Sequence, residues 1–161
     1  VIGVAFDPDN ELLAAADANG RAYLWDLISG DLARTFISRR SGGLNGVAFG
    51  LDGDLLAAAD GNGQVYLWDV ASGQLAGAFP HPGSRGVNGV AFAPGGPMLA
   101  AADGNGQVCL WDTASGQLAG AFPHPGSRGV NAVAFAPGGD LLAAADGNGC
   151  TYLWRLSPSA P

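Results

Sequence analysis

The side chains best suited to acid–base, nucleophilic or metal chemistry in this chain of 161 residues are two histidines and two cysteines. His81 and His124 lie in identical Pro-His-Pro-Gly-Ser-Arg-Gly segments, and neither segment places a distinct nucleophile beside an orienting acid. We therefore expect both histidines to be surface loop residues. Cys109 and Cys150 stand at unrelated positions of repeated segments, which indicates reduced, incidental thiols and not a disulfide framework.

Carboxylates offer a second kind of chemistry. Asp103-Gly104-Asn105-Gly106 has the start of a calcium loop but lacks the third oxygen ligand and the distant bidentate glutamate, so a hairpin turn explains it better. The chain has no Cys-x-x-Cys, no phosphate-binding glycine loop with a lysine and no carboxylate pair in a unique context. The sequence thus predicts no catalytic, cofactor-binding or metal-binding residue, and we expect a protein that is not an enzyme.

The charge and the hydropathy of the chain limit the classes of partner that it can bind. The net charge is −7 and all seven basic residues are arginines, which argues against nucleic acid because binding to phosphates requires clustered positive charge. No apolar run reaches the ~18 residues of a membrane span, and the start of the chain has no signal-peptide pattern. We expect a cytoplasmic location, with a membrane anchor upstream of Val1 left open.

The elements that position these residues follow a repeat of 43 residues. The four tryptophans of the chain recur at this period, and an aspartate follows each of the first three: Trp25-Asp26, Trp68-Asp69, Trp111-Asp112 and Trp154. Self-similarity at a fixed period of this length indicates supersecondary units that cannot bury their apolar faces alone.

Each repeat predicts four short strands. In the third repeat, Pro94-Gly95 and Gly104-Asn105-Gly106 are turn signals that separate alternating or continuously apolar runs. The alanine-rich run between them is too short for a stable helix. The expected strands of this repeat are residues 87–92, 98–102, 107–111 and 117–122.

The motifs Val-Asn-x-Val-Ala-Phe-x-Pro-x-Gly at residues 87–96, the Asn-Gly turn and Leu-Trp-Asp make the chain similar to the WD-repeat (WD40) family, most of all to its actinobacterial members. The resemblance implies an all-β fold of β-propeller blades, each a four-stranded antiparallel sheet. The expected blades cover about 1–40, 44–83, 87–126 and, without a fourth strand, 130–156, followed by a tail at 157–161.

The resemblance also implies a network that links a histidine, a serine, an aspartate and the tryptophan of a blade. Here Gly83 and Gly126 hold the histidine position, and the histidines are displaced by two residues. Aspartates hold the serine position and asparagines the aspartate position: Asp60, Asp103 and Asp146, then Asn62, Asn105 and Asn148. We expect the network to be absent or rebuilt.

The number of blades leaves three alternatives open. Propellers of this family usually have seven blades, whereas the four repeats supply three complete blades and three further strands with open edges. Additional blades upstream of Val1, two copies that close an eight-bladed ring, or a self-sufficient arc of four blades would each be consistent with the sequence.

The family geometry places the inter-blade loops and the turns between second and third strands on one face. This face gathers the candidate partner-binding residues Arg39, Arg40, His81, Arg85, His124 and Arg128. Most acidic residues fall on the opposite face, where they are either solvated turn residues or a docking surface for a basic partner. We expect a non-catalytic protein–protein interaction or scaffold module of a bacterial WD40 repeat protein, as the C-terminal part of a larger signalling protein. The alternatives are a structural unit that completes a propeller by homodimerisation, and a ligand-binding or enzymatic propeller that uses its central channel.

Overall fold

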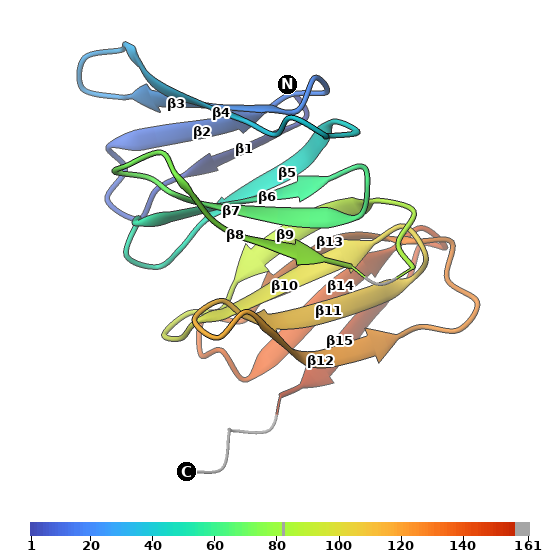
Figure 1. The fold of residues 1–161 in the computed structure, drawn as a ribbon. Coiled ribbons are helices and arrows are strands. Elements are labelled where there is room, and N and C mark those ends of the chain that lie inside the picture. The colour runs from blue at the N-terminus through green and yellow to red at the C-terminus, as the bar shows by residue number, and fades with distance from the viewer. Residues whose placement is uncertain (82, 157–161) are drawn as a thin grey trace.

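The computed structural model describes residues 1–81 and 83–156, which form fifteen strands and no helix. The predicted all-β fold of propeller blades is therefore confirmed. Each repeat folds into one antiparallel sheet whose strands are ordered as in the chain, and these sheets are numbered blades 1 to 4 here (Figure 1). Blades 1, 2 and 3 have four strands and blade 4 has three. The predicted tail at 157–161 lies outside the described residues.

The strands have the following bounds. Blade 1 consists of β1 (Gly3–Phe6), β2 (Leu12–Ala16), β3 (Arg21–Asp26) and β4 (Leu32–Ile37). Blade 2 consists of β5 (Leu44–Phe49), β6 (Leu55–Asp60), β7 (Gln64–Asp69) and β8 (Leu75–Pro80). Blade 3 consists of β9 (Val87–Phe92), β10 (Met98–Asp103), β11 (Gln107–Asp112) and β12 (Gln117–Pro123). Blade 4 consists of β13 (Val130–Phe135), β14 (Leu141–Asp146) and β15 (Thr151–Arg155).

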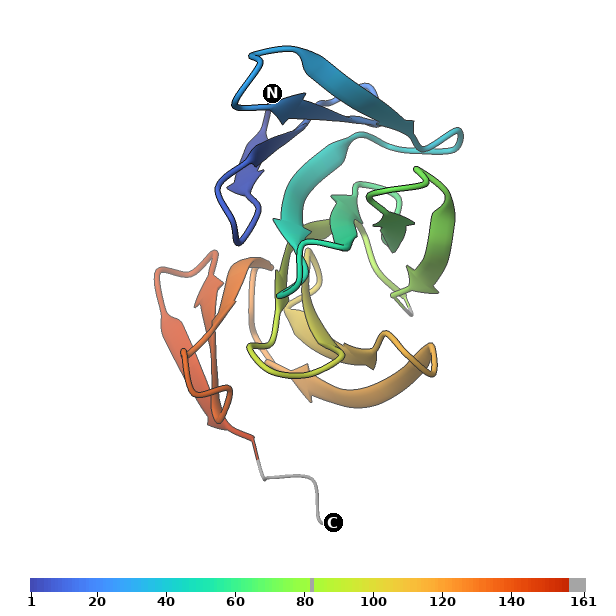
Figure 2. The same ribbon diagram turned by 90° about the vertical axis from the view of Figure 1, so that its left-hand side faces the viewer.

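The four blades follow one another in an open arc, with blade 1 and blade 4 at its two ends (Figure 2). The first strands β1, β5, β9 and β13 are neighbours in this order on the inner side. Their approach favours small residues, because a Cβ on Gly3 would lie 3.0 Å from the Cα of Gly46 and one on Gly89 would lie 3.2 Å from the Asn131 carbonyl oxygen. An amide side chain joins neighbouring inner strands, since Asn88 Nδ2 donates to the Val130 carbonyl oxygen at 2.8 Å.

The core lies between blades. In blades 2, 3 and 4 the tryptophan of the third strand packs against a phenylalanine from the fourth strand of the preceding blade, with ring centroids 5.5 Å apart in every pair: Phe36–Trp68, Phe79–Trp111 and Phe122–Trp154. The second strands of the internal blades, β6 and β10, are rich in alanine and are covered by neighbouring blades on both sides; Ala57, Ala58 and Ala59 have no exposed surface. The signature tryptophans therefore hold successive blades together.

The two ends of the arc expose positions that are buried at internal interfaces. Val4 is 62% exposed on blade 1, whereas its repeat equivalent Val47 is 9% exposed. Leu153 is 64% exposed on blade 4, whereas its equivalent Leu110 is 6% exposed. The end faces thus carry the same apolar residues as the contacts between blades. Within the described part of the chain, no segment forms a helix that could cross a membrane.

Candidate functional site

The inter-blade loops and the turns between second and third strands do share one face. Asn62 Nδ2, in the turn between β6 and β7, donates to the Arg40 carbonyl oxygen of the preceding loop at 2.5 Å. Asn148 Nδ2 donates in the same way to the Gly126 carbonyl oxygen at 2.9 Å. Four exposed arginines project from these loops, and none forms an ion pair with any residue in 1–81 or 83–156. This basic loop face consists of Arg39, Arg40, Arg85 and Arg128.

An apolar groove adjoins one end of the basic loop face. It has a volume of about 320 Å³ and lies where β4 meets β7 and β8. Ile37 and Leu75 expose more than half of their surface there, beside Arg39 and Arg40. The blade 1–2 groove is lined by Ile37, Ser38, Arg39, Arg40, Tyr66, Trp68 and Leu75. This arrangement places apolar surface directly beside two guanidinium groups.

The prediction that both histidines are surface loop residues is wrong for His81. Its side chain is buried, with Nδ1 3.2 Å from Asp103 Oδ2 and 3.7 Å from Cys109 Sγ. The reason is the small Cys109, which stands where the other repeats have tyrosine. At the next interface Tyr152 fills that space, and the ring of His124 stacks on it with centroids 3.5 Å apart. His124 is half-buried, so only part of its ring faces outward.

The buried His81 contact is structural in character. Burial lowers the pKa of the His81 imidazole, although the Asp103 carboxylate and the Ala101 carbonyl act in the opposite direction. Burial and the negative charge of Asp103 raise the pKa of the Cys109 thiol to about 11. A thiol with that pKa stays protonated near neutral pH and is a poor nucleophile. Although His81 Nδ1 lies 3.2 Å from Asp103 Oδ2, this oxygen accepts no hydrogen bond from any described residue. The contact between the two side chains is therefore electrostatic and not a hydrogen bond.

The network implied by the family resemblance is rebuilt around the aspartates. Asp60 and Asp103 are fully buried, and each accepts the N–H of the asparagine two residues later at 2.6 Å. The same asparagines then donate their amide groups to the preceding inter-blade loop; Asn105 Nδ2 donates to the Gly83 carbonyl oxygen. The aspartate thus fixes the turn, and the asparagine ties that turn to the neighbouring blade.

Most aspartates on the opposite face are turn residues, as the simpler interpretation expects. Asp26, Asp69 and Asp112 each accept backbone N–H groups from the turn that follows them, at 2.7–3.0 Å. Hydrogen bonds from the Ser29 and Ile28 N–H groups hold the pKa of Asp26 below its ordinary value. These carboxylates are already occupied by hydrogen bonds within the chain.

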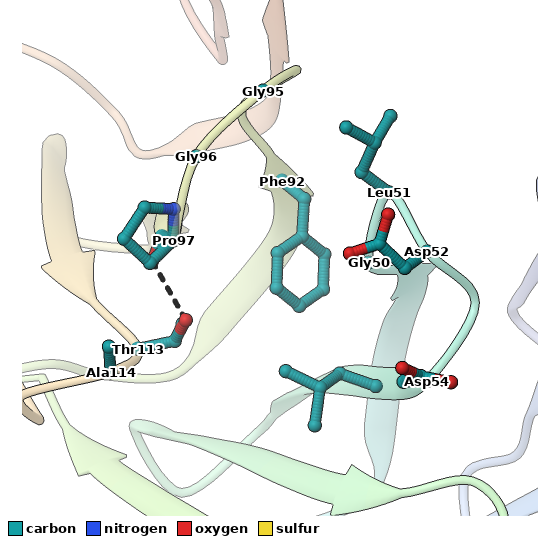
Figure 3. Close-up of a pocket in the computed structure, with 11 residues that line it drawn as sticks. Gly50, Leu51, Asp52, Asp54, Phe92, Gly95, Gly96, Pro97, Thr113 and Ala114 are labelled. Carbon is teal, nitrogen blue, oxygen red and sulfur yellow. Dashed lines mark hydrogen bonds between the residues drawn. The ribbon is translucent and has the colours of Figure 1, made fainter.

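A pocket of about 560 Å³ opens on this acidic face between blades 2 and 3 (Figure 3). Three turns form it: the turn before β6, the turn before β10 and the turn before β12. Thr113 Oγ1 donates to the Pro97 carbonyl oxygen at 2.8 Å and joins two of these turns (Figure 3). The blade 2–3 pocket is lined by Gly50, Leu51, Asp52, Asp54, Leu55, Phe92, Gly95, Gly96, Pro97, Thr113 and Ala114. Sequence reasoning missed it, although blade 2 alone has Leu-Asp-Gly-Asp in this turn.

A second hollow of about 330 Å³ lies where all four inner strands end. It is lined by one phenylalanine from each blade, Phe6, Phe49, Phe92 and Phe135, together with loop residues that include three prolines. This apolar lining offers few polar groups for the chemistry of a channel enzyme. In 1–81 and 83–156, no three His, Cys, Asp or Glu side chains are grouped so that they could hold a metal ion.

Comparison with known protein families identifies the repeat. The family model described as WD40 (WD domain, G-beta repeat) matches residues 1–26, 30–69, 73–112 and 116–155. The second, third and fourth matched segments each begin just before or at the start of a blade's fourth strand and end with the third strand of the next blade. Each of these three matched segments therefore spans one blade–blade interface. No curated protein matches the chain.

Proposed function

We propose, because the chain belongs to the WD40 repeat family, that it is a protein–protein interaction module whose basic loop face binds an acidic segment of a partner protein. WD40 repeats generally mediate binding between proteins or act as scaffolds. The proposal includes no catalytic activity of the chain itself. We further propose that the protein is a bacterial, cytoplasmic scaffold related to actinobacterial signalling proteins.

The observation that carries the proposal is the set of unpaired guanidinium groups beside the blade 1–2 groove. The chain as a whole has a net charge of −7, but Asp60, Asp103 and Asp146 in the turns of this face are buried, so the exposed charge of the face comes mainly from arginines. Such a face attracts acidic segments and sets their orientation. The apolar side chains of Ile37 and Leu75 add surface that an aliphatic or aromatic neighbour of the acidic residues can cover.

The burial of His81 removes its side chain from this proposed surface. We expect Arg39 and Arg40 to contribute most to binding, because they line the blade 1–2 groove and also belong to the basic loop face. Arg85 and Arg128 extend the positive surface along the next two inter-blade loops, and the outer part of His124 lies in the last of these.

Selection of peptides from a phage-displayed library on the immobilised chain tests this function. We expect the selected peptides to be enriched in Asp and Glu next to an apolar residue. The double substitution Arg39→Glu/Arg40→Glu should weaken their binding at least about tenfold, equivalent to ~1.4 kcal/mol. The control is Arg155→Glu, which changes an exposed arginine paired with Asp140 on the opposite face. Peptides that bind both variants equally would refute the assignment of the basic loop face.

A second candidate function is assembly through the end faces. The specific observation is that Val4 and Leu153 are exposed at positions whose equivalents are buried between blades. Asn131 adds to this, because its equivalents Asn45 and Asn88 donate to the inner strand of the next blade at 2.8 Å. A further blade of this type, from the same polypeptide or from a second copy, would cover these residues.

The solution mass of the 161-residue chain tests the second candidate. Light scattering over a concentration series should give a stable species of about twice 16.1 kDa if two copies close a ring. The substitution Leu153→Asp should shift that species to the monomer, and Leu118→Asp, at an exposed site on the outer strand β12, is the matched control. A folded monomer at all concentrations would exclude closure by a second copy.

A further inference from the structure

We propose that the blade 2–3 pocket binds an arginine side chain of a partner protein. The inference rests on the proposed function as an interaction module and adds a second contact, on the face opposite the basic loop face. Its basis is the conjunction of two carboxylates without partners among residues 1–81 and 83–156, an aromatic ring and an open space between two blades (Figure 3).

The charge of the pocket has no partner within the described part of the chain. Asp52 and Asp54 are exposed and line the pocket, and neither carboxylate accepts a hydrogen bond or forms an ion pair with any described residue. They differ in this from Asp26, Asp69 and Asp112, whose oxygens accept N–H groups of their own turns. A cationic group therefore gains two carboxylate ligands here without displacing an internal hydrogen bond.

Blade 4 shows which cation suits this position. Asp140 is the repeat equivalent of Asp54, and it forms an ion pair with Arg155 at 3.3 Å. Blade 2 has Asp69 at the position equivalent to Arg155, so Asp54 has no arginine of its own. The repeat thus already pairs this turn carboxylate with a guanidinium group, and in blade 2 the guanidinium would have to come from another molecule.

The apolar part of the pocket favours arginine over lysine. The ring of Phe92 stands in the middle of the pocket, between Leu51 and Asp52 on one side and Pro97 on the other (Figure 3). A guanidinium group is planar and weakly hydrated, so it can lie against an aromatic ring while its N–H groups reach a carboxylate. A lysine ammonium group is more strongly hydrated and makes no such planar contact.

The space is large enough and remains open. A volume of about 560 Å³ falls within the range of ordinary ligand pockets. A Cβ atom on Gly95 or Gly96 would have no atom within 4 Å, apart from its chain neighbours. The glycines on the blade 3 side therefore leave room for the methylene groups of an arginine that reaches Asp52 or Asp54 from outside.

The test uses capped tripeptides and NMR spectra of the ¹⁵N-labelled 161-residue chain. Acetyl-Gly-Arg-Gly-amide should shift the amide signals of the pocket residues, with a dissociation constant in the millimolar range. The lysine tripeptide should bind several-fold more weakly. The citrulline tripeptide, which has nearly the same shape without the charge, should cause no saturable shift.

Two variants and one control locate the site. Asp52→Asn/Asp54→Asn should weaken binding of the arginine tripeptide at least tenfold. Gly96→Leu should also abolish binding, because its side chain would fill the open space at a backbone conformation that accommodates it. Asp9→Asn/Asp31→Asn removes the same two charges from exposed turns outside the pocket and should leave binding within twofold.

The outcomes separate this inference from the proposed function. Saturable shifts at the pocket that both pocket variants remove and the control retains support it. Shifts outside the pocket, equal loss in the control, or no saturable binding of the arginine tripeptide overturn it. If acidic peptides still bind the basic loop face in that case, the proposed function stands and only the arginine pocket is refuted.

Discussion

Replacement of the signature tryptophan by alanine should cost much more stability inside the arc than at its end. Trp111 is 6% exposed and its ring lies 5.5 Å from that of Phe79 in the preceding blade. Trp25 occupies the equivalent position in blade 1, is half-buried, and has Tyr23 of its own strand as its aromatic neighbour. The two substitutions remove the same side chain from the same Leu-Trp-Asp motif, so most of their difference in destabilisation comes from the contact between blades.

The magnitude follows from burial. Trp111→Ala removes a buried indole and leaves a cavity, which costs about 3–5 kcal/mol, part of it the aromatic pair with Phe79 at about 0.5–1.5 kcal/mol. Trp25→Ala removes a ring that retains contact with water and lacks that pair, so we expect about 1–2 kcal/mol. Trp111→Phe should cost about 1 kcal/mol, because it keeps most of the packing and removes an indole N–H that has no hydrogen-bond partner in the described chain.

Urea unfolding at 25 °C, followed by circular dichroism and by the fluorescence of the remaining tryptophans, gives these free energies. The expected order of destabilisation is Trp111→Ala, then Trp25→Ala, with Trp111→Phe close to the latter. Equal losses for the two alanine variants would refute the view that the tryptophans act chiefly between blades.

The other predictions concern the buried histidine, the thiols and the inner strands. Cys109→Tyr should expel His81 from its buried position, and NMR titration should then give the imidazole a pKa near its ordinary 6.5; a histidine that keeps a lowered pKa would contradict this. Because the folded-state pKa of His81 lies below 6.5, the unfolded chain binds this proton more tightly, so the free energy of unfolding should fall as the pH decreases below about 6.5. His81→Gln should flatten that dependence in urea titrations at several pH values. The exposed Cys150 should react with Ellman's reagent at pH 8 on the order of 100-fold faster than Cys109, whose thiol is buried with a pKa of about 11. Asn88→Ala should cost about 1 kcal/mol in urea unfolding through the lost bond to the next inner strand, whereas Asn131→Ala, at an exposed site, should stay within about 0.5 kcal/mol.

The fold was accessible from the sequence because its signals are local and repeated. Pro94-Gly95 separates the first and second expected strands of the third repeat and Gly104-Asn105-Gly106 the second and third, and the bounds of β9 to β12 agree with the prediction within a residue. The Asn-Gly turn recurs in all four repeats, so every repeat predicts the same arrangement of strands. A local signal that occurs four times leaves little freedom for a different fold.

The position of His81 was not accessible in this way. His81 and His124 lie in identical segments, yet one side chain is buried against Asp103 and the other stacks on Tyr152. The difference arises in the next blade, 28 residues further along, where Cys109 replaces a tyrosine. The space that the small Cys109 side chain leaves cannot be predicted from the local sequence around His81, because Cys109 lies on a strand of another blade.

The blade 2–3 pocket was also beyond sequence reasoning, since its lining comes from three turns on two sheets. The residues themselves were visible, but their convergence depends on how blade 2 and blade 3 pack. Asp52 and Asp54 looked like ordinary turn aspartates until the structure separated them from those that accept hydrogen bonds within their own turns.

The offset between the sequence repeat and the sheet has a consequence for how such a chain can change over generations. Each matched segment from 30–69 onward contains the phenylalanine of one blade and the tryptophan of the next that packs on it, as Phe36 packs on Trp68. A duplicated or deleted segment of one period therefore brings or removes a finished contact together with both of its halves. Unequal recombination can lengthen or shorten the array by whole units without any compensating substitution, so the number of units is free to drift faster than the residues that join them.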